Sequence, residues 1–319
     1  MGRIMDLFKS KFDRETEAPS AAPVRQVVYP VLNAKGETVT EAAPAFVRGS
    51  SVTINGERWH YWHNWTEYRV PGLSFCGFYD ELLDTPGGVL VSGATGSGKS
   101  VVLNGILLSI LGQYRPFCKG GKDECEVFLS DPKIVEFRAY RTLPQVKRYA
   151  GDYDEIMSVL DSVDHLMMSR YELMAERGLK DWDGHRVFLF IDEIGDLMLT
   201  RKKDFLPRLT HLLNLCRAAG ITIFLASQSP SRQTIPAVVQ LNCTAKICLK
   251  CDTAIESRQV VGIPGGEKLP RHGVALVRTP KTGGIVEQAI PNCTDNDIDK
   301  VLTAVSRAET VCLRKQKIA

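Results

Sequence analysis

The chain has 319 residues, of which 44% are hydrophobic and 24% are charged, and its formal net charge is +3. The length allows one large domain, or one such domain with a small appendage. The composition is typical of a globular protein, and it lacks the strong basic excess of a static DNA-binding protein. The nine cysteines are odd in number and follow no framework spacing, and no apolar run reaches the roughly 18–20 residues of a membrane span. We therefore expect a cytoplasmic protein with no transmembrane segment.

Residues 1–48 predict a short terminal helix and a flexible linker. Ile4, Leu7 and Phe8 repeat at helical spacing, and residues 13–26 are rich in Glu, Ala, Pro and Ser. A frayed terminal helix is the favoured interpretation, and a docking or membrane-surface helix is the alternative.

Residues 49–86 predict a small β-rich subdomain. Residues 51–54 and 57–61 are β-prone runs joined by Asn55-Gly56, a pair that favours a two-residue hairpin turn. Aromatic residues crowd the stretch that begins in the second run: Trp59, Tyr61, Trp62, Trp65 and Tyr68. Such a cluster commonly packs a subdomain against its neighbour, and base stacking is the alternative.

A strand, a glycine-rich turn and an apolar helix follow at residues 89–108. The turn has the phosphate-loop spacing and consists of Gly93, Ala94, Thr95, Gly96, Ser97, Gly98, Lys99 and Ser100. Its glycines allow the backbone N–H groups to point at an anion, and the helix start adds the positive end of its dipole. We expect an ATP site in which Lys99 contacts the β- and γ-phosphates and the Ser100 hydroxyl binds Mg²⁺. A chance glycine-rich turn is the alternative.

The remainder of residues 87–305 alternates strands with helices. Continuous apolar runs are typical of strands buried on both faces of a parallel sheet. The expected strands are 127–130, 187–191, 221–226, 245–249 and 274–277, and a long helix extends across 156–173. The fold class is therefore α/β, with a mainly parallel central sheet flanked by helices. Residues 306–319 form a C-terminal tail.

Polar residues follow two of these strands at the sheet edge where ligands of open parallel sheets bind. Asp192 and Glu193 follow 187–191, and Gln228 follows the next strand. We assign Asp192 to Mg²⁺ together with Ser100, and Glu193 to orienting or deprotonating the attacking water. Gln228 is assigned to sensing the γ-phosphate. Helix capping by the acidic pair and a simple turn role for Gln228 are the alternatives.

Several sequence blocks occur in one order between residues 87 and 305. They are 93–100, 129–137 (LSDPKIVEF), 170–175 (RYELMA), 191–198 (IDEIGDLM), 217–221 (RAAGI), 226–230 (ASQSP), 256–258 (ESR) and 266–269 (GEKL). In this combination the chain resembles the FtsK/SpoIIIE family of DNA-translocating ATPases, and the combination is far more specific than the phosphate loop alone.

The resemblance implies RecA-like P-loop NTPase domains in a hexameric ring, with ATP sites at subunit interfaces and duplex DNA in the central channel. It also implies that loops carrying Arg258 and Lys268 contact DNA phosphates, which cationic side chains can do without reading bases. Ordinary solvated charges are the alternative. The trans-acting cation of the neighbouring subunit has three candidates, namely Arg217, Arg232 and Lys246.

We therefore expect an ATP-dependent translocase of double-stranded DNA for plasmid, conjugative-element or viral DNA transfer. We expect a DNA-processing protein as the partner, and we expect any recruitment of this chain to the membrane to occur through a partner protein. Two other functions remain open at this point: the motor of a protein secretion system, and an ATP-gated adaptor that does not translocate.

Overall fold

The computed structural model describes residues 82–83, 86–114, 125–280, 282–290, 292–295, 298–299 and 302, and four short strands nearer the N-terminus. Those strands form two antiparallel pairs: β1 (Val31–Leu32) with β2 (Thr38–Val39), and β3 (Ser51–Ile54) with β4 (Glu57–His60). The second pair confirms the predicted hairpin. The predicted terminal helix, the linker, the aromatic residues after β4 and the C-terminal tail lie outside the described residues.

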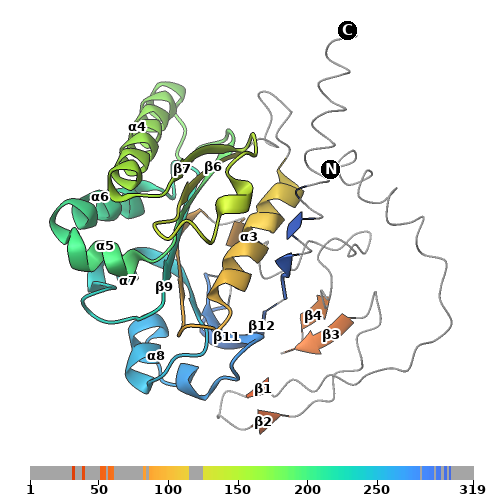
Figure 1. Ribbon diagram of the computed structural model, residues 1–319. Helices are drawn as coiled ribbons and strands as arrows, with labels where there is room; N and C mark the ends of the chain where they lie inside the picture. Colours follow the sequence, from red (N-terminus) through yellow and green to blue (C-terminus); the bar gives the residue numbers. More distant parts are fainter. Residues whose placement is uncertain are drawn as a thin grey trace.

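An eight-stranded sheet forms the centre of the described chain, in the order β12-β11-β10-β5-β9-β8-β6-β7 (Figure 1). The strands from β10 to β7 are parallel, and β11 and β12 are antiparallel to their neighbours. Their bounds are β5 (Gly87–Ser92), β6 (Cys125–Ser130), β7 (Val146–Ala150), β8 (Arg186–Ile191), β9 (Ile221–Ser227), β10 (Cys243–Cys248), β11 (Val274–Arg278) and β12 (Ile285–Ala289). The predicted α/β fold is confirmed.

The sequence analysis missed β7 and β12, which are the two edge strands of the sheet. Each carries polar or charged residues in place of a continuous apolar run, because only part of an edge strand is covered by other elements. Lys147 and Arg148 of β7 are exposed.

Helices cover both faces of the sheet (Figure 1). One face packs against α3 (Lys99–Gln113), and the other packs against α4 (Tyr153–Arg177), α5 (Ile194–Thr200), α6 (Lys202–Leu215), α7 (Ala237–Asn242) and α8 (Ala254–Val261). Alternate residues of β8 divide between the two layers: Phe188 and Phe190 face α3, whereas Leu189 and Ile191 face the other helices. Two short 3-10 helices, η3 (Arg138–Tyr140) and η4 (Gly266–Lys268), complete the described elements. None of the helices in the described residues combines the length and apolarity needed to cross a bilayer.

Two local expectations need correction. Leu173 was included in the apolar pattern of the long helix, but it is 44% exposed, because the helix turns this position away from the sheet. The strand expected at 245–249 spans Cys243–Cys248. The loop beyond it begins at Leu249 and includes Lys250. This loop contacts the phosphate loop, since the Ala94 N–H donates to the Lys250 carbonyl at 2.8 Å.

Candidate nucleotide site

The turn between β5 and α3 has the backbone of an anion-binding loop. Gly96 and Gly98 adopt positive φ values of 75° and 98°, which a residue with a side chain would adopt only under strain. Gly98 occupies the N-cap position of α3, and no side chain caps this helix in the described structure. The amide groups of the first helical turn are therefore available to a negatively charged ligand.

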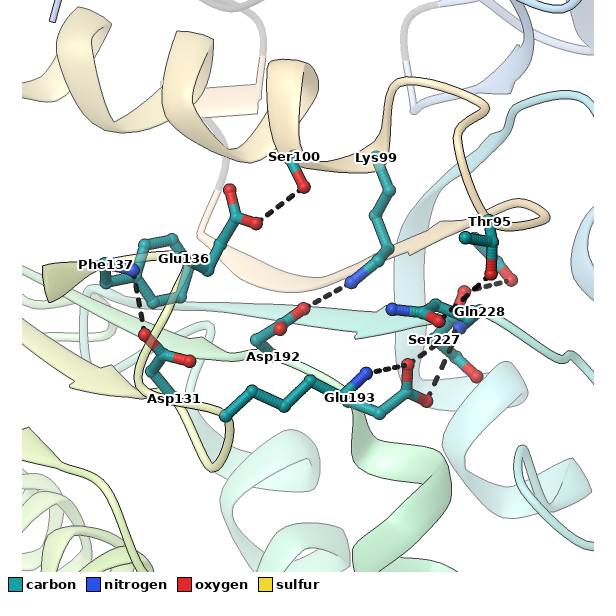
Figure 2. Close-up of polar contacts among 12 residues, drawn as sticks. Thr95, Lys99, Ser100, Asp131, Glu136, Phe137, Asp192, Glu193, Ser227 and Gln228 are labelled. Atoms are coloured by element: carbon teal, nitrogen blue, oxygen red, sulfur yellow. Dashed lines mark hydrogen bonds and ion pairs between the residues drawn. The ribbon is translucent and has the colours of Figure 1, made fainter. Parts of the chain in front are cut away.

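Lys99 and Asp192 form a buried ion pair at the base of this loop (Figure 2). Their side chains are 7% and 4% exposed. Asp192 reaches this position because it follows β8, and β9 alone separates β8 from β5 in the sheet. The lysine and the acidic pair thus converge as predicted, and the lysine neutralises the Asp192 carboxylate.

Glu193 lies beside this pair in a strained conformation. Its φ is 57°, which is uncommon for a residue other than glycine and is found where the surroundings enforce it. Its carboxylate accepts the Gln228 N–H at 3.2 Å and lies 3.9 Å from the Lys133 ammonium. Burial raises the pKa of Glu193, and the charges of Lys99 and Lys133 oppose that rise.

The helix-capping interpretation of Glu193 is wrong. The residue stands at the N-cap position of α5, but its side chain makes no capping hydrogen bond. It is instead directed to the end of β9, toward the phosphate loop (Figure 2). An acidic side chain in this place can hold or deprotonate a water molecule next to bound phosphates.

Gln228 joins the end of β9 to the phosphate loop. Its side-chain oxygen accepts the Thr95 hydroxyl at 3.3 Å, while its backbone N–H binds Glu193. A change at the phosphate loop can therefore be transmitted to β9 through one residue. The role of a plain turn residue does not account for these two contacts.

Glu136 is a site residue to which the sequence analysis assigned no role, although it lies in the block 129–137. It accepts the Ser100 hydroxyl at 2.6 Å and the Asn104 side-chain N–H at 2.6 Å. Burial raises its pKa, and the hydrogen bond from Ser100 opposes that rise. The available signal was an acidic residue shortly after a strand that ends at the nucleotide edge of the sheet.

Arg271 is a second residue that sequence reasoning missed. A Cβ placed on Gly96 would lie 3.0 Å from the Nη2 atom of Arg271, so the guanidinium covers the phosphate loop. Arg271 is otherwise exposed. No local pattern indicates this contact, because the two residues are far apart in the sequence.

The residues at the loop fit a magnesium ion. The Ser100 hydroxyl and the Asp192 carboxylate offer oxygen ligands, which Mg²⁺ prefers, and the ion commonly completes its shell with water and substrate phosphates. Within the described residues, no group of three or more His, Cys, Asp and Glu is placed to hold a metal. Two buried hydroxyls, that of Ser97 in the loop and that of Ser227 at the end of β9, have no hydrogen-bond partner among the described residues.

The two predicted DNA-contacting cations lie together, but one correction is needed. Arg258 is part of α8 and not of a loop, whereas Lys268 ends the short helix η4. Both are exposed, and both act electrostatically on the carboxylate of Glu267. The Ser257 hydroxyl accepts the Gly266 N–H at 2.9 Å and thereby fixes η4 to α8.

The three candidates for the trans-acting cation lie in different places. Arg217 is exposed and precedes β9 at the end opposite to Gln228, and Arg232 is exposed in the turn beyond it. Lys246 lies within β10, where it pairs with Leu90 of β5, and burial lowers the pKa of its ammonium. None of these positions belongs to the loop that holds Lys99.

The sequence and the fold both match known proteins. Residues 78–188 match the model of the FtsK/SpoIIIE family. The DNA translocase FtsK of Helicobacter pylori (strain J99) is 28% identical over 237 residues, with 70% of this chain and 27% of that protein covered. The DNA translocase SpoIIIE of Bacillus subtilis (strain 168) is 30% identical over 237 residues, with 68% of this chain and 29% of that protein covered.

A solved structure shows the same fold. The pCW3 conjugation coupling protein TcpA, in a monomer form with ATPγS, superposes with a TM-score of 0.58 and 22% identity over 69% of this chain and 65% of TcpA. The chain spans less than a third of the length of the two curated relatives.

Proposed function

We propose that this chain, whose residues 78–188 match the FtsK/SpoIIIE family model, is an ATPase that moves double-stranded DNA. One observation carries the proposal. The strand order places Lys99, Asp192, Glu193 and Gln228 together at the carboxyl ends of the parallel strands, beside the phosphate loop. In the described structure no side chain caps α3, the helix that follows this loop.

ATP hydrolysis would use each of these groups in a separate role. The loop amides and Lys99 bind the phosphates, and Lys99 exchanges its contact with Asp192 for one with the β- and γ-phosphates. Ser100 and Asp192 would hold Mg²⁺, which would supply charge neutralisation at the phosphate oxygens. Glu193 orients the attacking water and accepts its proton. Gln228 then reports the loss of the γ-phosphate to β9.

Contacts within the described residues connect this site to the cations that would hold DNA. The Ala94 N–H donates to the Lys250 carbonyl at 2.8 Å, and the Lys250 ammonium in turn binds the Glu267 carbonyl. Glu267 is the residue whose carboxylate Arg258 and Lys268 stabilise. A shift of the phosphate loop would therefore displace the cations, which can bind the regular phosphate backbone without sequence preference.

The assembly that we propose is a homo-oligomeric ring, with six subunits as the expected number. A cation from the neighbouring subunit would complete each site, and the candidates are the exposed Arg217 and Arg232 and the strand residue Lys246. Arg217 and Arg232 carry the planar fork that suits a phosphoryl transition state, whereas Lys246 does not. Mixing wild-type protein with each single variant would identify the donor, because a trans-acting residue lowers the rate of its neighbour.

The finer proposal is that the translocated DNA belongs to a plasmid, a conjugative element or a virus, delivered by a DNA-processing partner. Deletion of the gene should then abolish transfer of that element and leave chromosome segregation unchanged. Normal transfer in the deletion strain would contradict this assignment.

The decisive experiment measures the ATPase rate with and without linear duplex DNA, together with displacement of a triplex-forming strand. We expect DNA to raise the rate and the strand to be displaced, and we expect Lys99→Met and Glu193→Gln to abolish both. Glu172→Gln, an exposed substitution on α4, is the matched control. Measurement of the mass of the assembly in the presence of ATPγS would show how many subunits the proposed ring contains.

Each failure indicates a different protein. A rate that is indifferent to DNA would favour a motor for another polymer, such as a secreted polypeptide. Hydrolysis without strand displacement would favour an ATP-gated adaptor.

Finally, Lys250→Met should reduce the stimulation of the ATPase rate by DNA and preserve the basal rate if the contacts from Ala94 to Glu267 couple the two sites.

A further inference from the structure

The hydroxyl of Ser100 is already engaged by a carboxylate. Its Oγ lies 2.6 Å from Oε2 of Glu136, which comes from the loop after β6 (Figure 2). The other carboxylate oxygen of Glu136 accepts the Asn104 side-chain N–H, also at 2.6 Å. Since Asn104 is one helical turn after Ser100 on α3, the carboxylate spans both residues along the same face of the helix.

This carboxylate is held in place from behind. The Tyr140 hydroxyl, which is fully buried, donates to Asn104 Oδ1 at 2.5 Å. Asn104 is therefore fixed with its N–H group toward Glu136 and its oxygen toward Tyr140. This chain of hydrogen bonds runs from the exposed Ser100 to the buried Tyr140, and it selects one orientation of each member.

The loop that carries Glu136 is itself constrained. Asp131 is fully buried, and its Oδ2 accepts the Phe137 N–H at 2.9 Å. Between these residues, Ile134 has a φ of 55°, an outlier for a β-branched side chain. Strain of this kind persists where the surroundings over-determine it, and it is concentrated at functional sites. The strain at Ile134 accompanies the placement of Glu136 against Ser100.

A hydroxyl that ligates Mg²⁺ uses an oxygen lone pair, so its O–H bond points away from the ion and can donate a hydrogen bond to another acceptor. Glu136 is the acceptor in position, and a carboxylate that accepts this hydrogen bond increases the electron density on the ligand oxygen. Partners of this type orient metal ligands, and their loss commonly lowers metal affinity about 10–100-fold.

We propose that Glu136 is a positioning residue for Mg²⁺, which acts through Ser100 by accepting a hydrogen bond from its hydroxyl while the serine oxygen faces the ion. Asn104 and Tyr140 hold the carboxylate in that orientation. The proposal rests on the ATP site described above, but it concerns metal binding and requires neither hydrolysis nor DNA.

The test is a Mg²⁺ titration of the full chain with bound mant-ADP, followed by fluorescence. Glu136→Gln should move the midpoint to about 10–100-fold higher Mg²⁺, while the affinity for mant-ADP in EDTA stays within about twofold of wild type. Glu136→Asp, whose shorter carboxylate withdraws from Ser100, should act in the same direction. Glu172→Gln should leave the midpoint unchanged.

A double-substitution cycle separates the proposed route from a general effect on the site. If Glu136 acts through Ser100, then adding Glu136→Gln to Ser100→Ala should shift the midpoint no further than about twofold. Full additivity, an unchanged midpoint in both Glu136 variants, or an equal loss of metal-free affinity would each overturn the proposal. An ATPase rate that ignores DNA would contradict the motor alone, whereas wild-type protein without a Mg²⁺-dependent signal would contradict both proposals.

Discussion

Replacement of Lys99 by methionine should destabilise the nucleotide-free protein as well as abolish hydrolysis. The structure pairs Lys99 with Asp192 at side-chain exposures of 7% and 4%. Methionine preserves most of the side-chain volume but leaves Asp192 as a buried charge without its partner. Removing one member of a buried ion pair lowers stability by about 3–5 kcal/mol. At about 2–4 °C per kcal/mol for a domain of this size, the Tm should fall by roughly 6–20 °C.

The matched variant is Lys99→Met combined with Asp192→Asn, which removes both charges and keeps their shapes. We expect it to recover most of the lost stability while remaining inactive, because a neutral pair requires far less solvation than a lone buried carboxylate. Thermal and urea unfolding in EDTA without nucleotide would measure both variants. A single variant as stable as wild type, or a double variant less stable than the single one, would refute the reasoning.

Three further changes test other parts of the structure. Since only the ionised Glu193 accepts a proton, the ATPase rate should fall as pH decreases through its pKa, which burial raises. Lys133→Met should move this limb of the kcat profile to higher pH, and a shift to lower pH would contradict the geometry. Arg271→Ala removes the guanidinium over Gly96 and should raise the KM for ATP about fivefold, or roughly 1 kcal/mol, with little change in kcat. Arg170→Met deprives the Ala219 and His185 carbonyls of a buried donor, so urea unfolding should show a loss of about 3 kcal/mol with unchanged ADP affinity.

The candidate site was predictable where one short segment carries the chemistry. The phosphate loop needs glycines, a lysine and a serine at fixed spacing, so its function can be recognised from eight consecutive residues. Asp192, Glu193 and Gln228 were predicted from their residue types and their places after apolar runs that indicate buried strands, together with the phosphate loop upstream. The structure brings all three to the loop.

Other members of the site could not be read in this way. Although the place of Glu136 shortly after a strand was a signal, its contact with Ser100 becomes apparent only when α3 and the loop after β6 are placed against each other. The same is true of Arg271, whose contact with Gly96 depends on the path of the chain after η4. Edge strands β7 and β12 were missed because partial exposure removes the apolar run that identifies a strand.

The sequence alone determined the α/β class, the phosphate loop and the resemblance to the FtsK/SpoIIIE family, because burial and backbone geometry leave local patterns of residue type. Only the tertiary structure decided that β9 lies between β5 and β8, and that the Ser100 hydroxyl donates a hydrogen bond to Glu136. Strand order and contacts between distant segments arise from the packing of the whole sheet and its helices. No local periodicity encodes them, since many arrangements of the same strands bury the same residues.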